Sequence, residues 1–206
     1  MDEDIRQIVR EGYERGDYAG HYRDGSMTEL QSDFLGRLTA LLPEGAHILD
    51  LGCGTGIPFD KFLVDQGFSV TGIDFTSKHI ERARKNLPSA TFLEGDYSRF
   101  DFGDSRFQAI LALYTVFHIP REEQQNLFEK ISDLLTPSGI ILVSLGFSGG
   151  EGVEDDWCGA RMAWSTWDKE RYRTMISTHF DIIWSGHETD VGDQDELHWW
   201  VLARKK

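Results

Sequence analysis

The sequence predicts an α/β fold built on a seven-stranded, mostly parallel sheet with an antiparallel last strand. From residue 47 onward, short apolar runs alternate with amphipathic segments, which is the pattern of parallel strands joined by helices. The runs are almost continuously apolar, as expected for strands buried on both faces. The segment between the last two runs is too short for a parallel crossover, so the final strand should run antiparallel at or near the edge of the sheet.

The N-terminal part of the chain, residues 1–44, is predicted to form a helical lid. Its first helix covers residues 3–14, and a loop follows at residues 20–25. Ser26 and Glu29 have the spacing of a capping box, in which two side chains satisfy free N–H groups at the start of a helix. The second helix should end at Pro43, and its apolar face consists of Leu30, Phe34, Leu38 and Leu41.

Strands and helices alternate through the rest of the chain. The strands are expected at residues 47–52, 68–74, 90–96, 107–113, 139–146, 180–186 and 197–204. The helices are expected at residues 58–66, 76–86, 120–135 and 167–178. A chain of 206 residues with 40% hydrophobic residues is sufficient for one domain with a sizeable core.

Composition and charge limit where the protein works and what it binds. There is no 18-residue apolar run, and the N-terminal sequence lacks the apolar core of a signal peptide. The two cysteines, Cys53 and Cys158, are too few for a disulfide framework. These features favour the cytoplasm. The net charge of −14 argues against nucleic acid as a partner and favours a neutral or cationic small molecule.

A glycine-rich loop follows the first predicted strand in the sequence LDLGCGTGIPFD. Gly52, Gly54 and Gly56 alternate with other residues at the strand's carboxyl end, where open α/β sheets bind ligands. A nicotinamide-binding loop would place its third glycine at position 57, which is Ile57. A Walker-type phosphate loop would require a Lys-Ser or Lys-Thr pair after the loop, and Pro58 and Phe59 offer none.

The segment ILDLGCGTG resembles the first motif of class I S-adenosylmethionine-dependent methyltransferases, and four further segments match in order. These are VTGIDF, FLEGDYSRF, FQAILALYTVFHI and LLTPSGIILVS. The resemblance is strong over residues 45–146 and moderate over the last two strands. It implies a Rossmann-like, doubly wound fold, S-adenosylmethionine as the cofactor, and methyl transfer to a small-molecule acceptor.

The resemblance also implies a role for particular residues. Asp50 would reach the ammonium group of the cofactor, Gly52, Cys53 and Gly54 would pass under its methionine part, and Leu113 would offer a carbonyl to the ammonium. Asp74 would bind both ribose hydroxyls, which suits a carboxylate facing a vicinal diol. Phe75 would lie against adenine, while Asp96 and the backbone of Tyr97 would read the adenine edge.

Three residues are candidate bases. His118 follows the fourth predicted strand, and imidazole can accept a proton at neutral pH. Tyr13 and Tyr22 belong to the N-terminal segment that often covers the site in similar enzymes. Ordinary packing is the structural alternative for all three. No spaced metal-ligand motif is present, so no catalytic metal is predicted.

Residues 147–165 form a segment too long for a plain connection and are predicted to be a substrate lid. Its aromatic residues beside Asp155 and Asp156 could hold a cationic amine, although a packed lid with an acidic rim is equally compatible. Residues 166–206 would complete the single domain. Two other functions stay open: a catalytically silent S-adenosylmethionine-binding regulatory module and, less favoured because of Ile57, a nicotinamide-dependent oxidoreductase.

Overall fold

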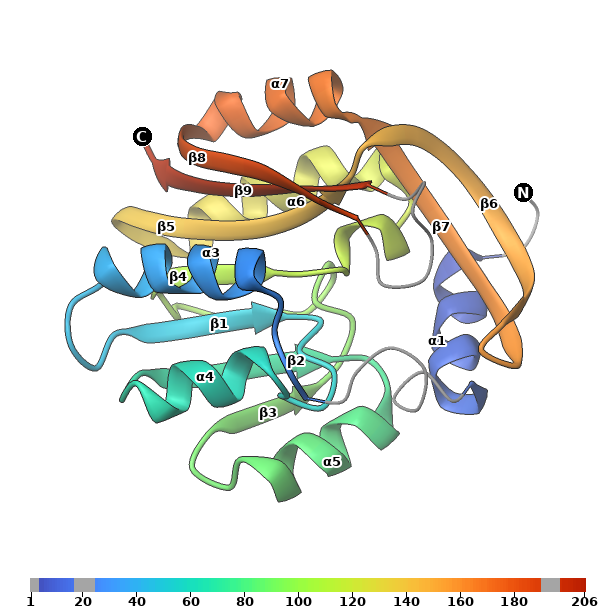
Figure 1. The fold of residues 1–206 in the computed structure, drawn as a ribbon, viewed down its shortest axis with the longest axis horizontal. Coiled ribbons are helices and arrows are strands. Elements are labelled where there is room, and N and C mark those ends of the chain that lie inside the picture. The colour runs from blue at the N-terminus through green and yellow to red at the C-terminus, as the bar shows by residue number, and fades with distance from the viewer. Residues whose placement is uncertain (1–3, 17–24, 190–196) are drawn as a thin grey trace.

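The computed structural model describes residues 4–16, 25–189 and 197–206. Its main sheet has seven strands in the order β3-β2-β1-β4-β5-β9-β8, which confirms the predicted fold class (Figure 1). The strands are β1 His47–Leu51, β2 Ser69–Asp74, β3 Thr91–Glu94, β4 Phe107–Ala112, β5 Leu135–Gly146, β8 Phe180–Thr189 and β9 Leu197–Lys205.

Helices cover both faces of the sheet. On one face lie α3 Glu29–Ala40, α4 Phe59–Asp65 and α5 Ser77–Asn86, and on the other α6 Arg121–Leu134 and α7 Lys169–His179. Successive residues of a strand point to opposite faces. Thus Ile48 packs beneath Leu38 of α3, whereas Leu49 joins the cluster that contains Ile131 of α6. Both faces of the central strands are therefore buried.

The parallel register brings several strand ends to one edge of the sheet. β1 pairs with β2 on one side and with β4 on the other, and all three run parallel. The strand order therefore reverses at β1, which opens a crevice beyond the carboxyl ends of β1 and β4. The last strand, β9, runs antiparallel between β5 and β8 as predicted, and lies one strand in from the edge that β8 forms.

The helix cap lies two residues beyond the predicted position. Thr28, rather than Ser26, caps α3, and its side chain and that of Gln31 form the capping box. Both pairs have the required spacing, but Thr28 Oγ1 also donates to Glu188 and Gln31 Nε2 donates to Tyr114 Oη at 2.8 Å. Leu41 lies after the helix and is 39% exposed, so it does not belong to the buried face.

The predicted lid segment is a β-hairpin. β6 Ser148–Trp157 pairs antiparallel with β7 Ala160–Asp168 in a separate two-stranded sheet. The first helix, α1 Ile5–Arg15, packs against this hairpin through a cluster of Ile5, Ile8, Val9, Met162 and Ala163. Figure 1 shows α1 beside β6 and β7, beyond the carboxyl end of β1. The part of the predicted N-terminal lid that meets the hairpin is α1, and α1, β6 and β7 are here called the cover; α3, predicted as part of the same lid, packs on the main sheet instead.

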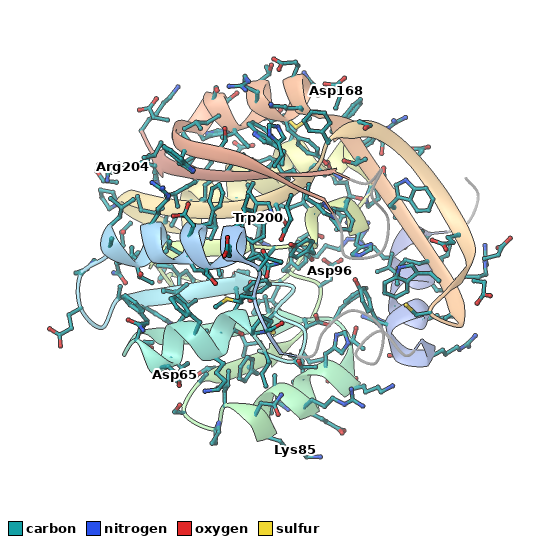
Figure 2. All side chains as sticks on the ribbon, in the orientation of Figure 1. Asp65, Lys85, Asp96, Asp168, Trp200 and Arg204 are labelled. Atoms are coloured by element: carbon teal, nitrogen blue, oxygen red, sulfur yellow. The ribbon has the colours of Figure 1, made fainter. Side chains whose placement is uncertain are left out.

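Close packing joins the two parts of the cover. A side chain at Gly12 would lie 2.5 Å from the carbonyl oxygen of Arg161, so only glycine lets α1 approach β7 this closely. Elsewhere, charged residues such as Asp65 and Lys85 lie at the periphery, whereas Trp200 lies in the interior (Figure 2). Within the described ranges, no helix has the length and apolar character needed to cross a bilayer.

Candidate functional site

A cavity of about 520 Å³ lies between the carboxyl ends of the central strands and the cover. Its volume falls in the range of small-molecule sites. Every predicted cofactor residue lines it, namely Asp50, Gly52, Cys53, Gly54, Asp74, Phe75, Asp96, Tyr97 and Leu113. Tyr13 and His118 line it as well, whereas Tyr22 lies outside the described residues. The structure therefore brings the predicted residues together around a single space.

The glycines of the loop have different neighbours. A side chain at Gly52 would lie 2.3 Å from Thr115 Oγ1, so this glycine allows the loop to pack on the segment after β4. A side chain at Gly56 would lie 3.0 Å from Leu87 Cδ1 and 3.2 Å from Phe92 Cζ. A side chain at Gly54 would meet no atom of the described residues within 4 Å. Because Gly54 also lines the cavity, it is the glycine that leaves room for a ligand.

Asp74 connects the glycine loop to the start of α5. Its Oδ2 accepts a hydrogen bond from Gly54 N at 3.0 Å, and its Oδ1 accepts one from Thr76 N at 2.8 Å. The carboxylate is 6% exposed and lines the cavity. A carboxylate has about four acceptor positions, so these two bonds leave capacity for a diol. Asp74 thus stabilises the turn before α5 and is also placed to bind the ribose hydroxyls, as predicted.

Asp50 shares its surroundings with a second acid that the motif did not single out. Asp60, in the first turn of α4, is wholly buried and lies close enough to Asp50 for the two carboxyl groups to interact. Burial, followed by the neighbouring charge of Asp50, raises the pKa of Asp60 well above its ordinary value. Of the two acids, Asp50 lines the cavity, and Asp60 lies behind it in the interior.

Cys53 and Tyr97 have structural contacts. Burial, together with the nearby Asp60, Asp74 and Asp50, raises the pKa of the Cys53 thiol, so it is a thiol rather than a reactive thiolate. Tyr97 Oη donates to the Thr115 carbonyl at 3.0 Å, and burial raises the pKa of its phenol. The side chain of Tyr97 thus fixes the loop after β4.

His118 lies between the cavity and the cover. Its Nδ1 lies 3.1 Å from the Ala163 carbonyl oxygen, and its Nε2 lies 2.9 Å from Tyr13 Oη. A carbonyl only accepts, so Nδ1 carries the proton and Nε2 accepts from Tyr13. Burial lowers the pKa of His118 to about 4, so the ring is neutral at pH 7. Tyr13 and His118 thus form one hydrogen-bonded pair in the cavity wall.

Several cavity residues have no signal in the motifs. Tyr114 follows β4 with a left-handed φ of 55°, and its hydroxyl donates to Glu188. Glu188 also accepts from Trp200 Nε1 at 2.9 Å, which ties this wall to β8 and β9. Arg6 could have been suspected, because it shares a helix face with Arg10 and Tyr13 at spacings of four and three residues. In the described part of the chain, no three His, Cys, Asp or Glu side chains are placed to hold a metal ion.

Comparisons with known sequences give a methyltransferase match. Residues 48–139 match the family model described as a methyltransferase domain. An uncharacterized methyltransferase of Oceanobacillus iheyensis is 30% identical over 95 residues, covering 46% of this chain and 44% of that protein. A sterol 24-C-methyltransferase of Gibberella zeae is 29% identical over 189 residues, covering 79% of this chain and 46% of that protein. Each match thus spans less than half of the relative's own length.

Solved structures share the fold. Magnesium protoporphyrin IX methyltransferase of Synechocystis, solved with bound S-adenosylhomocysteine, has a TM-score of 0.73 at 17% identity, covering 98% of this chain and 100% of that one. A S-adenosylmethionine-dependent methyltransferase of Methanosarcina mazei has a TM-score of 0.70 at 17% identity, covering 87% and 98%. The sequence match over residues 48–139 and the shared fold of these structures confirm the resemblance to class I S-adenosylmethionine-dependent methyltransferases.

Proposed function

We propose that the protein transfers a methyl group from S-adenosylmethionine to a small-molecule acceptor. The observation that carries the proposal is the open space over Gly54, in a cavity at the point where the strand order reverses. A ligand that lies directly against the backbone there needs a residue without a side chain. Gly54 meets this need, and Asp50 and Asp74 line the same cavity.

The residues present suit the parts of the cofactor. Asp50 would hold the ammonium group, since its carboxylate lines the cavity. Asp74 would accept hydrogen bonds from the ribose hydroxyls, and Phe75 would cover adenine. Leu113 would offer its carbonyl oxygen to the ammonium. When bound, the cofactor supplies a methyl group already activated by a sulfonium, so the protein's main task is to align the acceptor.

Tyr13 and His118 are proposed to receive the acceptor's proton where one must leave. His118 Nε2 accepts a hydrogen bond from the Tyr13 hydroxyl, and both side chains line the cavity in which the acceptor would lie. A neutral His118 can take the proton of Tyr13 as Tyr13 accepts one from the acceptor. This arrangement makes Tyr13 the contact residue and His118 its partner. No role is assigned to Tyr22.

The acceptor is proposed to be neutral or cationic, because the chain carries a net charge of −14. Relatives are named for small-molecule acceptors, among them sterol, a hydroquinone and an amino sugar nucleotide. We propose the same broad class, with neither nucleic acid nor a membrane as a partner. A cytoplasmic location is part of the proposal, and two free cysteines support it.

The first experiment measures binding by calorimetry with S-adenosylhomocysteine and, in parallel, NAD⁺. We expect binding of the first and none of the second; the reverse would favour an oxidoreductase and overturn the proposal. The second experiment supplies methyl-labelled S-adenosylmethionine with a metabolite extract filtered to small molecules. Label in a small product is expected. Tight cofactor binding without transfer to any fraction would favour the silent regulatory module.

A further inference from the structure

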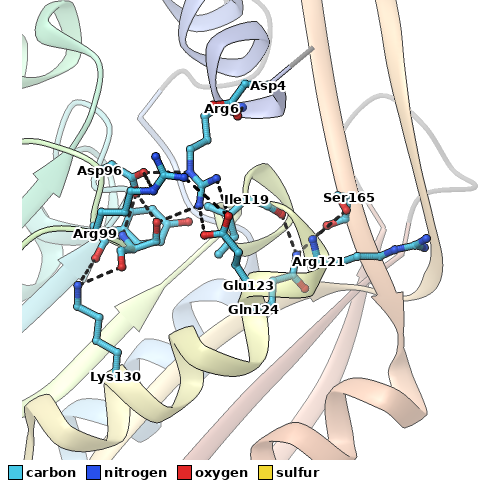
Figure 3. A network of polar contacts seen from close by, with 12 residues as sticks. Asp4, Arg6, Asp96, Arg99, Ile119, Arg121, Glu123, Gln124, Lys130 and Ser165 are labelled. Carbon is cyan, nitrogen blue, oxygen red and sulfur yellow. Dashed lines mark hydrogen bonds and ion pairs between the residues drawn. The ribbon is translucent and has the colours of Figure 1, made fainter. Parts of the chain in front are cut away.

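A buried cation joins the N-terminal helix to the cavity wall (Figure 3). Arg6, in the first turn of α1, is 8% exposed and lines the cavity. Its Nε lies 2.9 Å from Asp96 Oδ2, and its Nη1 and Nη2 donate to the two carboxylate oxygens of Glu123 at 3.1 and 2.6 Å. A buried charge is costly unless it is fully paired. These contacts supply that pairing and tie α1 to the turn after β3 and to α6.

Asp96 is held from two sides. Its Oδ1 accepts from Ser98 N at 2.9 Å and from Ser98 Oγ at 2.6 Å, while its Oδ2 faces Arg6. A carboxylate offers about four acceptor positions, so one position on Oδ2 stays available. Asp96 also lines the cavity. The remaining position can therefore accept one hydrogen bond from a ligand.

Two further residues on the same face of α1 contact the site. The guanidinium of Arg10 lies 5.3 Å from the centre of the Phe75 ring, and Tyr13 Oη lies 2.9 Å from His118 Nε2. Residues 6, 10 and 13 are spaced four and three apart, so they project from one side of the helix. Each of them touches a different residue of the cavity wall.

We propose that Arg6 is a positioning residue for adenine recognition, holding Asp96 so that binding of the adenine amino group and docking of α1 support each other. The inference rests on the proposed function. Without Arg6, the next cation beside Asp96 is Arg99, whose Nε is 3.9 Å from the same oxygen and whose side chain is 62% exposed. The carboxylate would then keep its two Ser98 hydrogen bonds on Oδ1 but lose the buried cation that orients Oδ2. Because coupling is reciprocal, adenine binding must also stabilise the docked helix.

The test compares two ligands that differ at one group. S-Adenosylhomocysteine has the adenine amino group, and S-inosylhomocysteine has a carbonyl oxygen there. Calorimetry measures both dissociation constants for the wild type, Arg6→Met and Arg99→Met. We expect the wild type to prefer the adenosyl ligand by about tenfold or more, as for loss of a hydrogen bond to a charged group. Arg6→Met should reduce this preference to below about threefold, and Arg99→Met should keep it.

The ratio of the two constants separates positioning from general damage. A structural loss weakens both ligands equally and leaves the ratio unchanged, which would overturn the inference; so would a wild type without any preference. Arg6→Lys retains the buried charge but not the planar fork, so it guards against failure to fold and should give an intermediate ratio. Hydrogen exchange in α1 should slow more with the adenosyl than with the inosyl ligand.

The outcomes also distinguish the two proposals. If the wild type binds neither ligand, the proposed function fails, and the inference fails with it. If the wild type binds and prefers the adenosyl ligand while Arg6→Met keeps that preference, only the role of Arg6 is wrong.

Discussion

The sheet edge and the cover form opposite walls of one cavity by different means. At the sheet edge, neighbouring parallel strands set the positions of the side chains, with Leu51 beside Ile73 and Asp50 beside both Gly72 and Leu111. In the cover, side chains distant in sequence make the contacts: Tyr13 and His118 are 105 positions apart. Backbone hydrogen bonds place one wall, and side-chain contacts place the other.

This difference predicts that the two walls can be perturbed separately. A change at the sheet edge should remove ligand binding while the cover stays folded. A change in the cover should alter turnover, coupling or local stability while the sheet stays intact. Regions held by fewer backbone hydrogen bonds open at lower free energy.

The largest expected effect comes from the sheet edge. Gly54→Val should abolish binding of S-adenosylhomocysteine, about 100-fold or more by calorimetry, because the side chain would fill the open space against the loop. Gly103→Val is the matched control: Gly103 has a similar φ of 57° and equally open surroundings, but does not line the cavity. Equal affinity in both variants would place the ligand elsewhere.

The next prediction concerns Tyr13, the residue of the cover that is proposed to accept a proton. Tyr13→Phe should lower transfer of labelled methyl to the small-molecule product by about 10²-fold, with little change in affinity for S-adenosylhomocysteine. Tyr172→Phe, which removes a buried hydroxyl bonded to Gln124 at 2.8 Å outside the cavity, serves as the control. Unchanged turnover in Tyr13→Phe would exclude Tyr13 as the proton acceptor.

His118, which contacts both α1 and β7, should make the stability of the protein depend on pH. The pKa of His118 is lowered to about 4 in the folded protein, against about 6.5 when unfolded. The unfolded chain therefore binds more protons between these values, and the contribution of neutral His118 is present above pH 6.5 and lost as pH falls toward 4. It amounts to about 3 kcal/mol. As the pH is lowered from 7.5 to 4, the free energy of unfolding measured in urea should fall more for the wild type than for His118→Asn. Parallel plots of unfolding free energy against pH for the two proteins would contradict this.

The smallest effect tests whether the cover is one unit. Ile8→Ala removes a buried side chain between α1 and β7 and should cost about 2 kcal/mol locally. Amide exchange should then accelerate in both α1 and β7, with β1 and β4 unchanged. Acceleration confined to α1 would show that the hairpin is held independently and that the cover has two parts.

The sheet edge could be predicted from sequence because its signals are local. Leu49–Gly56 and Asp74 lie within single strand-to-loop segments, so apolar runs and glycine spacing locate them. The capping box was predicted at Ser26 and Glu29, two residues too early, because Thr28 and Gln31 also make contacts with the distant Glu188 and Tyr114. Local spacing contains no information about such partners.

The cover was less predictable for the same reason. The glycines and acids of residues 148–157 lack the alternation of a strand, and pairing with β7 makes the segment one. Asp60 resembled a surface acid in an amphipathic helix, and only the fold places it beside Asp50. Asp96 was predicted only as a residue that contacts the adenine edge, whereas in the structure it also forms an ion pair with Arg6.

The contact between Gly52 and Thr115 has a genetic consequence. Substitutions at Gly52 and Gly54 would both score as null alleles in a selection for activity, yet they differ in how they can be reverted. An alanine at Gly52 collides with a partner, the Thr115 side chain, at 2.3 to 3.2 Å. Replacement of Thr115 by glycine is therefore the candidate intragenic suppressor at position 52, since alanine would keep the Cβ that lies 2.7 Å away; the backbone strain of a side chain at φ 77° would remain. No such suppressor exists for Gly54, because the space it guards belongs to no residue of the described chain.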